Sequence, residues 1–420
     1  MLRMIDVELV KEQPILEYAK TKLKLRRVGN TYFALCPFHK EKTPSFAISP
    51  IKNNFKCHGC GEYGSIIDLC MELEGLKFPH AVKYLAKFFG LQVKEVIQVT
   101  EEEGVSSSPS IEQIVITHNK CQDIFSSNFF QNYQAKRYMF DRGYSSREEL
   151  EKWGVGLCPE QLDIPGDSLL EAGMLSERGN VLFKNRITFP IHNILGHIVA
   201  YTARNIDNTK DLMKYVNTKE TMAYVKHKLL YNLHRAKKAI KANGQFIIME
   251  GPTDVHAMSR MGIETAICAL GTSLNSEQVK LLKPMSKFGY LMKDGDKAGR
   301  KSALRDIGTF WENEMDVEVI ECEEGHDPAS MIAKYGFDYH LHCKTYPSQK
   351  YFYIKSLELN EGDMDKALEQ AIEKIALCPN LVKRETYIKK LAMYSGFAIR
   401  SLFAALEKEL LNQFKRKRLK

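Results

Sequence analysis

Two short pairs of metal-binding residues near the start of the chain constrain its fold more than any other feature. Cys36 and His39 have two residues between them, and so do Cys57 and Cys60. Thiolate and imidazole groups with this spacing suit a tetrahedral zinc ion, and four protein ligands leave that ion no open position. We therefore expect a closed, structural zinc site made by these four residues. The competing interpretation is that these four side chains are unrelated and bind no metal. A neighbouring histidine and a neighbouring cysteine are alternative ligands.

The alternative ligands are His58 and Cys70, and the regular spacing favours the first four residues over them.

Basic side chains alternate with aromatic rings around the zinc motif, and this pattern predicts a contact with nucleic acid. Lysines neutralise phosphates, and exposed rings stack on unpaired bases. We expect Lys42, Lys56 and Phe46 to contact single-stranded DNA. The alternative is that the rings form the small core of the zinc-binding domain, and we expect this for some of them.

The composition describes a globular chain with a moderate basic excess. Of its 420 residues, 44% are hydrophobic and 27% are charged, and the net charge is +8. This balance excludes a mostly disordered chain, a collagen-like chain and a disulfide miniprotein, whereas a basic excess is compatible with nucleic acid and is shared by many enzymes. No apolar run reaches the roughly 18 residues of a membrane helix, and the first residues lack the apolar core of a secretory signal. We therefore expect a cytoplasmic protein without membrane contact, whose ten cysteines are free or bind metal.

Changes in the spacing of apolar residues divide the chain into regions. Residues 5–27 have helical spacing, and Thr100–Ser110 is acidic, then serine-rich, with no apolar face, as is typical of a linker. Two β-rich runs, Arg186–Ile191 and Gly196–Arg204, predict a hairpin. From residue 244 to residue 325, apolar strands alternate with helices, which predicts a parallel sheet covered on both faces. Helical spacing returns after that region.

Acidic residues follow three of the predicted parallel strands. Glu250 ends one strand and shortly precedes Asp254, while Asp294 and Asp296 follow a second strand and Asp327 follows a third. Because ligands bind at the carboxyl ends of strands in such sheets, we expect these side chains to meet in one crevice. Crowded carboxylates repel one another, and Mg²⁺ suits an all-oxygen site that also binds phosphate. Taken singly, each acidic group has an ordinary explanation. Asp254 could interact only with the dipole of its own helix, and Asp-Gly could be a simple turn.

In these motifs the chain resembles the bacterial DnaG-type primases. CPFHKEKTPSF…KCHGCG is similar to their zinc-binding motif, and FKNRITFPI…GHIVAYTAR…KYVNT…AYVKHKLLYNL is similar to the first part of their RNA polymerase domain. IIMEGPTD…ALGTS…DGDKAG…HDP resembles their TOPRIM core, which topoisomerases also contain. The three motif groups occur in the order of the family, so the resemblance is specific.

The resemblance implies roles for individual residues. It implies a catalytic acidic cluster that binds Mg²⁺ or Mn²⁺, formed by Glu250, Asp254, Asp294, Asp296 and Asp327. The metal ligands among these are Glu250, Asp294, Asp296 and Asp327, and Glu250 is also the candidate general base. The resemblance further implies a basic ridge for template and incoming nucleotide, formed by Arg186, Arg204, Lys214, Tyr215 and Lys226. Without the resemblance, these basic residues would be interpreted as solvated strand or helix faces.

Two departures from the family pattern affect the prediction. The third acidic signature of the family is Asp-x-Asp, but here Ala329 occupies the second position, which predicts a weaker second metal site or a lower activity. The residues after the TOPRIM region suffice only for the helical end of a polymerase domain. We therefore expect the usual helicase-docking domain to be absent, as in a short form from a mobile element.

These observations predict an α/β multidomain protein. Its expected parts are a zinc ribbon with flanking helices (1–100), a linker (101–112), a mixed α+β N-terminal subdomain of the polymerase domain (113–243), a TOPRIM parallel-sheet core (244–343) and a C-terminal helical subdomain (344–420). The expected cofactors are structural Zn²⁺ and catalytic Mg²⁺ or Mn²⁺.

The resemblance implies a DNA primase, a nucleotidyltransferase that joins ribonucleoside triphosphates into short RNA primers on single-stranded DNA during replication. We expect a monomer, with a replicative helicase as a further partner. The first alternative is a catalytically weak or inactive factor that binds or loads single-stranded DNA, and Ala329 is the feature that favours it. The second alternative is another TOPRIM enzyme, a topoisomerase or nuclease, against which the zinc motif and the RITFPI region argue.

Overall fold

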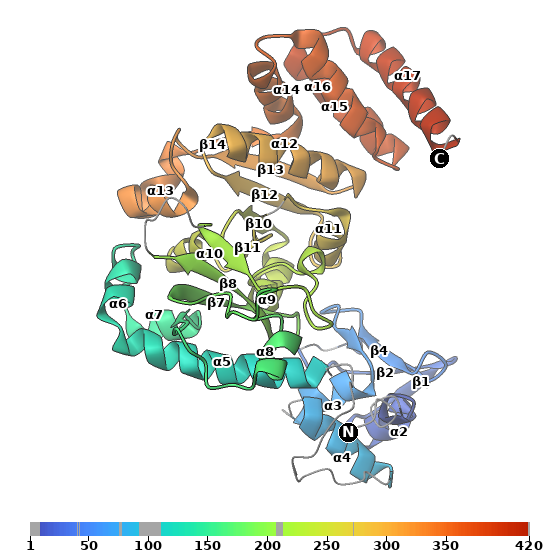
Figure 1. Cartoon of the computed structure of the whole chain (residues 1–420). Coiled ribbons are helices and arrows are strands. Elements are labelled where there is room, and N and C mark those ends of the chain that lie inside the picture. The colour runs from blue at the N-terminus through green and yellow to red at the C-terminus, as the bar shows by residue number, and fades with distance from the viewer. Residues whose placement is uncertain are drawn as a thin grey trace. The chain divides into compact units, whose positions relative to one another are not determined.

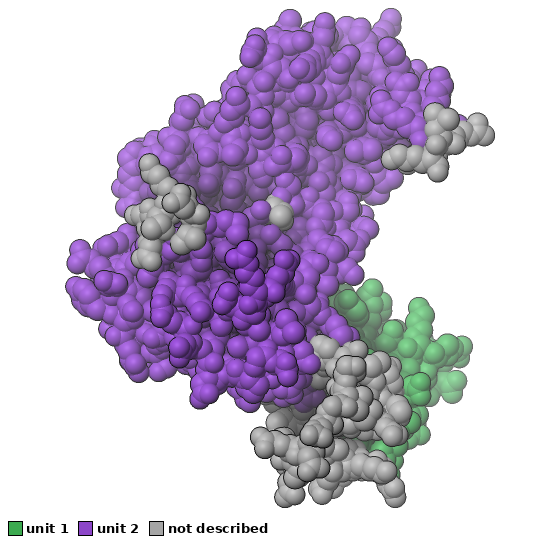
Figure 2. All heavy atoms as spheres, viewed as in Figure 1, with its two compact units in different colours: residues 1–106 green, residues 107–420 purple. Residues whose placement is uncertain are grey.

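The chain folds into two compact units, residues 1–106 and residues 107–420 (Figure 2). The computed structural model describes residues 9–39, 41, 43–74, 78–91, 111–206, 213–271 and 273–418. The predicted linker Thr100–Ser110 lies outside the described residues. Ile111 and Glu112, which we assigned to the linker, belong to the first helix of the second unit.

The first unit is a small antiparallel sheet with helices beside it. Its strands are β1 (Arg26–Val28), β2 (Thr31–Ala34), β3 (Phe46–Ser49), β4 (Asn54–Cys57) and β5 (Tyr63–Gly64), paired in that order. Its helices are α2 (Ile15–Lys22), α3 (Ile66–Glu74) and α4 (Phe78–Phe88). Side chains of β4 alternate between exposed and buried, as the two faces of a strand require. The buried face packs on the helices, and this contact forms the core of the unit.

The helix predicted over residues 5–27 is wrong in extent, and residues 5–8 lie outside the described part. Helix α2 begins after Pro14, which caps it in an extended conformation, and β1 already begins at Arg26. The side chain of Asn53 explains the break, because it accepts a hydrogen bond from the Ile15 amide (2.9 Å) and donates to the Gln13 carbonyl (2.9 Å). Asn53, which is distant in sequence, therefore fixes the chain between the helical turn before Gln13 and the start of α2 at Ile15.

The second unit begins with a four-stranded antiparallel sheet and the helices around it. The strands are β6 (Gly156–Leu157), β7 (Arg186–His192), β8 (Ile198–Asn205) and β9 (Tyr215–Asn217), paired in that order. The helices are α5 (Ile111–Gln131), α6 (Tyr133–Phe140), α7 (Arg147–Lys152) and α8 (Gly166–Glu171). Strands β7 and β8 pair antiparallel, so the predicted hairpin is confirmed.

A five-stranded sheet follows, and its first four strands are parallel. The strands are β10 (Phe246–Met249), β11 (Ala266–Cys268), β12 (Phe288–Lys293), β13 (Asp316–Glu321) and the antiparallel edge strand β14 (Lys344–Pro347), in the order β11-β10-β12-β13-β14. The helical segments are η1 (Lys226–Lys228), α9 (Leu233–Asn243), α10 (Pro252–Arg260), α11 (Ser276–Leu282), α12 (Lys297–Glu312), α13 (Pro328–Tyr335) and η2 (Gly336–His342). After β11 the chain returns past β10 to form β12, so the strand order reverses between β10 and β12. Open α/β sheets bind their ligands at such a reversal.

Four helices complete the second unit (Figure 1). They are α14 (Ser348–Leu359), α15 (Met364–Ala376), α16 (Leu381–Ser395) and α17 (Ile399–Arg418). Trp311 at the end of α12 joins them to the sheet, since its ring lies 5.3 Å from that of Phe352 and 5.4 Å from that of Tyr387. Among the described residues, no helix is long and apolar enough to cross a membrane. The predicted fold class is confirmed, whereas the boundaries of the subdomains within residues 107–420 stay a prediction.

Candidate functional site

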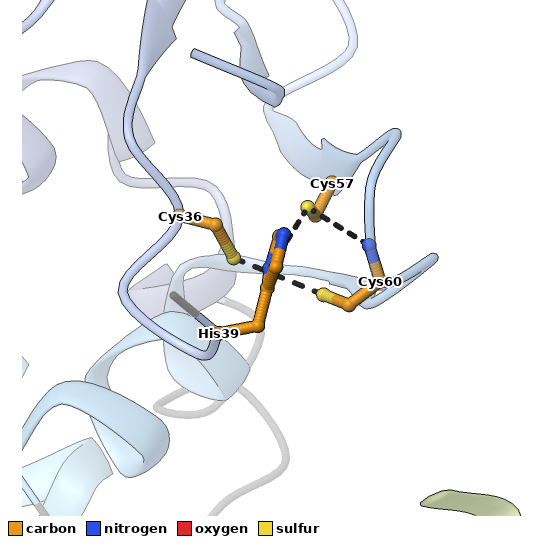
Figure 3. A group of neighbouring side chains, drawn as sticks. All are labelled: Cys36, His39, Cys57 and Cys60. Carbon is orange, nitrogen blue, oxygen red and sulfur yellow. Dashed lines mark hydrogen bonds between the residues drawn. The ribbon is translucent and has the colours of Figure 1, made fainter. Parts of the chain in front are cut away.

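The four predicted zinc ligands come together in the first unit (Figure 3). Their donor atoms all lie within 4.8 Å of one another, with the sulfurs of Cys36 and Cys60 3.8 Å apart and Cys57 Sγ 3.9 Å from His39 Nδ1. Zinc–sulfur bonds of about 2.3 Å at tetrahedral angles put two sulfurs about 3.8 Å apart, so the geometry fits zinc. Burial raises the pKa of Cys57, but hydrogen bonds from Ser45 and Cys60 outweigh it and lower that pKa to about 7, which favours the thiolate that binds metal.

The alternative ligands do not take part in this group. Cys70 lies in the core of the unit, where its thiol faces the Ala81 carbonyl at 3.9 Å. His58 is exposed and is not part of the group of donor atoms. The four residues chosen from their spacing are therefore the ones that the fold brings together.

Glu41 holds this group in place, and sequence reasoning missed it. One carboxylate oxygen accepts hydrogen bonds from the backbone amides of Cys36 (2.6 Å) and Ser45 (3.1 Å). The other accepts from the Ser45 hydroxyl and lies 3.2 Å from Nε2 of His39. Since Nδ1 of His39 faces Cys57, Glu41 binds the ring nitrogen that points away from the metal position. Such a carboxylate orients a zinc-bound histidine and fixes its tautomer.

We expect Glu41→Gln to weaken zinc binding by about 10- to 100-fold, because an amide places a donor where His39 and Ser45 need an acceptor. The measurement is zinc affinity by competition with a chromophoric chelator. Glu72→Gln, on the exposed face of α3, is the matched control. Equal affinities in both variants would show that Glu41 only packs beside the site.

The predicted acidic residues follow the parallel strands at the point where the strand order reverses. Glu250 follows β10, Asp294 follows β12, and Asp327 lies in the loop after β13. Two backbone hydrogen bonds tie the last two loops together, from the Gly295 amide to the His326 carbonyl (2.8 Å) and from the Gly325 amide to the Gly295 carbonyl (3.2 Å). The backbone itself therefore keeps Asp294 near Asp327.

Two glycines make this close approach of the loops possible. A Cβ atom on Gly295 would lie 2.1 Å from the carbonyl oxygen of Glu323. A Cβ atom on Gly299 would lie 2.2 Å from the carbonyl oxygen of Asp294. No side chain fits at such distances, so the glycines of the Asp-Gly-Asp-x-x-Gly motif are steric requirements of the site.

Electrostatic interactions connect the acidic side chains to one another, and the region where they lie is called the acidic crevice below. Burial raises the pKa of Asp294 to about 7, helped by the charges of Glu250, Asp327 and Asp296. Burial also raises the pKa of Asp254 to about 8, helped by Asp327 and Asp294. Glu250 Oε1 and Asp294 Oδ1 are buried without any hydrogen-bond partner. Buried, unpaired carboxylate oxygens beside further carboxylates fit a divalent cation such as Mg²⁺.

The five acidic residues differ in how many oxygens they leave free. Asp254 uses both, accepting from the amides of Gly251 (3.1 Å) and Ala329 (3.3 Å). Asp296 and Asp327 each use one oxygen to cap a helix, accepting from the amides of Gly299 and Ser330, both at 2.7 Å. Among the described residues, only the zinc ligands bring three or more donor atoms within 4.8 Å of one another. The carboxylate oxygens are more widely spaced than the zinc ligands.

In magnesium-free buffer, we expect the second unit to become less stable as the pH rises above about 7, where its buried histidines, whose pKa values are lowered by burial, are mostly neutral in both the folded and the unfolded chain. The folded pKa values of Asp254 and Asp294, about 8 and about 7, exceed the ordinary value of 3.8. Between these values the folded state holds protons that the unfolded chain has released, so stability falls through this window as pH increases. The measurement is the thermal midpoint at about pH 7 and about pH 9 with and without Mg²⁺, and Mg²⁺ should stabilise more at the higher pH. A midpoint that rises with pH in the absence of Mg²⁺ would contradict the coupling.

The predicted basic residues divide into buried and accessible groups. Arg186 is buried and donates to the Met213 carbonyl (2.8 Å). Arg204 is also buried and donates to the hydroxyl groups of two tyrosines, one of which is Tyr215 (2.6 Å). In the folded chain these two guanidinium groups therefore link β7 and β8 to neighbouring segments, and their contact with template or nucleotide stays a prediction.

Lys214 and Lys226 are the accessible members of the set. Lys214 is exposed, and its charge opposes the upward shift of the Asp294 pKa, so the two side chains are close enough to interact electrostatically. Lys226 is half-buried, and burial lowers its pKa. Its backbone amide donates to Glu220 Oε1 (2.9 Å). Lys214 is thus the basic residue that the fold places best for an anionic ligand of the carboxylates.

The aromatic prediction for the first unit needs a correction. Phe46 is fully buried, with its ring 5.5 Å from that of Phe38 and 5.0 Å from that of Phe55. It therefore presents no surface to a base and belongs to the core. Lys42 lies outside the described residues, while Lys56 is exposed.

The opposite face of the same sheet carries a row of basic and aromatic residues. The strand register pairs Arg26 with Phe33, Phe33 with Ala47, Ala47 with Lys56, and Lys56 with Tyr63. The Tyr63 side chain is 75% exposed, and Arg26 and Lys56 are also exposed. This arrangement was not predicted, because it depends on the pairing of all five strands.

Three segments of the chain match described protein families. Residues 3–101 match the CHC2 zinc finger, residues 124–237 the N-terminal domain of the DNA primase catalytic core, and residues 247–332 a Toprim-like domain. The matches contain the zinc ligands, the buried arginines and the acidic residues, respectively. Their order along the chain is the order expected from the motifs.

Curated relatives of the chain are named DNA primases. The protein of Neisseria meningitidis serogroup A is 33% identical over 371 residues, which cover 82% of this chain and 61% of that protein. The protein of Listeria monocytogenes is 31% identical over 427 residues, which cover 94% of this chain and 67% of that protein. The chain therefore spans about three fifths to two thirds of the length of these relatives.

Solved structures agree at the level of the fold. The zinc-binding and RNA polymerase domains of the Aquifex aeolicus primase match with a TM-score of 0.61 and 24% identity over 94% of this chain and 98% of that chain. A DnaG primase catalytic domain solved with bound single-stranded DNA matches with a TM-score of 0.57 and 24% identity over 68% of this chain and 96% of that chain. The predicted zinc site is thus found in the matching CHC2 domain, and the acidic crevice in the matching Toprim domain. Together with the relatives above, these matches show that the chain belongs to the DnaG-type DNA primase family.

Proposed function

We propose that this chain synthesises short RNA primers on single-stranded DNA by Mg²⁺-dependent nucleotidyl transfer. The acidic crevice carries the proposal, because it leaves the buried oxygens of Glu250 and Asp294 unpaired where strands β10 and β12 end. Membership of the primase family supports the reaction type. Since the chain spans only part of its relatives, the activity is a proposal for this chain.

In the proposed reaction, the 3′-oxygen of the growing strand bonds to the α-phosphorus of a ribonucleoside triphosphate, and pyrophosphate leaves. Glu250, Asp294, Asp296 and Asp327 would hold Mg²⁺ or Mn²⁺. When bound, the cation neutralises charge on the phosphate oxygens and favours loss of the hydroxyl proton.

The chain's own residues have separate tasks in this scheme. Glu250, which lies beside Asp294, is also the candidate acceptor of the hydroxyl proton. Lys214 places a positive charge opposite the triphosphate beside Asp294. Asp254 acts as a positioning residue, because its two backbone contacts hold the start of α10 against the start of α13. The backbone amide of Ala329 donates the hydrogen bond to Asp254 in this contact. The position of this loop therefore does not depend on a second aspartate at residue 329.

The exposed row on the zinc-binding domain is the proposed contact for the template. Lys56 neutralises phosphate, and Tyr63 stacks on an unpaired base. Phe46 is not part of this proposal, because it is buried.

We expect Tyr63→Ala to weaken binding of single-stranded DNA by about 5- to 150-fold, which corresponds to the loss of about 1–3 kcal/mol of stacking. Lys56→Ala should weaken binding on all sequences and reduce its salt dependence by about one counterion. The measurement is fluorescence anisotropy with labelled oligonucleotides and the zinc-loaded chain. Ile51→Ala is the control, since Ile51 is 78% exposed and lies in the turn between β3 and β4. An equal loss of affinity in the control and in Tyr63→Ala would show that Tyr63 does not stack on a base.

The decisive experiment is primer synthesis by the purified chain with Mg²⁺, four ribonucleotides and randomised single-stranded templates. Template-dependent oligoribonucleotides are the expected product. Tight binding without incorporation would instead indicate the inactive binding factor, which the similarity to DNA primases does not favour. Nicking of supercoiled DNA would instead indicate a topoisomerase or nuclease.

We further propose that the chain acts as a monomer in the cytoplasm. Light scattering with and without template tests the monomer. The expected contact with a replicative helicase stays a prediction from the family resemblance.

A further inference from the structure

Two cysteines face each other where the edge strand of the parallel sheet begins. Strands β13 and β14 pair antiparallel, with Ile320 opposite Thr345 and Glu321 opposite Lys344. One step further, the same register puts Cys322 opposite Cys343. Opposed residues in such pairs have Cβ atoms about 4.5–5.5 Å apart, and a disulfide needs about 3.5–4.5 Å, so only a small adjustment separates the two states.

The two thiols already interact directly. The interaction between the two side chains is the largest cause of their opposite pKa shifts. It raises the pKa of Cys322 and lowers that of Cys343. Cys343 is therefore the member of the pair that more readily forms the reactive thiolate.

Access to solvent distinguishes the two cysteines in the same sense. The structure describes all ten cysteines, and outside the zinc site Cys343 is the only one that is not buried. Cys322 is 4% exposed. An external reagent thus reaches Cys343 first, and Cys322 lies behind it as the second thiol.

We propose that Cys322 and Cys343 form a reversible disulfide and that small-molecule disulfides such as oxidised glutathione are the oxidant. The Cys343 thiolate attacks one sulfur of the oxidant, forms a mixed disulfide and releases one thiolate. Cys322 then loses its proton to solvent and attacks the Cys343 sulfur, which expels the second thiolate. In total, two protein thiols are oxidised and one disulfide is reduced to two thiols.

The disulfide would act on the loop that carries Asp327. Cys322 begins this loop, and the carbonyl oxygens of Cys322 and Glu323 line the space that Gly295 leaves open. The Glu323 side chain already ties the loop to α13 by accepting from the hydroxyl of Tyr335 (2.8 Å). A covalent bond from Cys322 to Cys343 would close the segment that contains α13 and η2 into a loop and restrict its motion. Since Asp327 lies in this segment, oxidation of the thiols would affect the acidic crevice.

The test equilibrates the zinc-loaded chain in buffers with increasing ratios of oxidised to reduced glutathione, followed by alkylation and peptide mapping. The expected result is a cross-linked peptide joining Cys322 to Cys343, which dithiothreitol reverses. Hydrogen exchange of the α13 backbone should slow when the link forms. Both measurements are independent of primer synthesis, so they stand or fall separately from the proposed function.

Variants identify the order of the two steps. Cys343→Ser should abolish the reaction with glutathione, whereas Cys322→Ala should stop at a stable glutathione adduct on Cys343. Cys378→Ser, at another buried cysteine, should leave the cross-link unchanged. A wild-type chain that accumulates only the glutathione adduct, or that does not react at Cys343, would overturn the proposal.

Discussion

Asp294→Asn is expected to reduce primer synthesis by roughly a thousandfold. A bound cation supplies several kcal/mol of charge stabilisation in the transition state, and each 1.4 kcal/mol or so corresponds to a factor of ten in rate. Asp294 has a buried oxygen without a partner and interacts electrostatically with three other carboxylates. Asparagine keeps the shape of the side chain and removes the charge, so the loss should come from the cation site. The measurement is the rate of ribonucleotide incorporation across a range of Mg²⁺ concentrations.

Stability separates this effect from misfolding. In magnesium-free buffer at about pH 8, a neutral side chain removes repulsion within the crevice, so Asp294→Asn should raise the thermal midpoint. The combination of a more stable fold and a lost activity is not expected from a structural defect. Asp163→Asn, at an exposed position, is the control. Full activity of Asp294→Asn would remove Asp294 from the catalytic site.

The acidic crevice could be predicted because it depends on a simple property of the fold. Glu250, Asp294 and Asp327 are far apart in sequence, but each follows a parallel strand, and parallel strands end at the same edge of a sheet. The zinc site was also predictable, since its ligands occur as local pairs whose spacing fits the ion. Both predictions need only the local spacing of residues or the type and order of the helices and strands, and neither needs to know how side chains pack.

The residues that sequence reasoning missed depend on which face of an element is buried. Alternation along β3 and β4 predicts that Phe46 lies on one face and Lys56 on the other, but it does not say which face packs on the helices. Tyr63 joins Lys56 only through the pairing of β4 with β5. The hydrogen-bond partners of Arg204 could not be predicted for the same reason, because these tyrosines come from other elements.

Asp306→Asn is expected to lower the free energy of unfolding of the second unit by about 3–5 kcal/mol, because it leaves a buried ammonium group unpaired. Asp306 is fully buried and lies 2.8 Å from Nζ of Lys293, which is itself only 4% exposed. Lys293 directly precedes Asp294 at the end of β12. The other oxygen of Asp306 accepts a hydrogen bond from the Leu274 amide (2.8 Å). The measurement is denaturant unfolding followed by circular dichroism.

A second substitution shows that the unpaired charge causes the loss. Adding Lys293→Met to Asp306→Asn removes that charge, while the oxygen of the new amide side chain can still accept from the Leu274 amide. The double variant should therefore recover most of the stability, since buried ion pairs are often replaceable by apolar residues. The exposed pair of Glu277 and Lys280, 3.1 Å apart on α11, provides the control, and Glu277→Gln should change stability by no more than about 1 kcal/mol. If the double variant were as unstable as Asp306→Asn, the hydrogen bond and packing of Asp306, and not its charge, would hold Asp294 and the neighbouring loop in place.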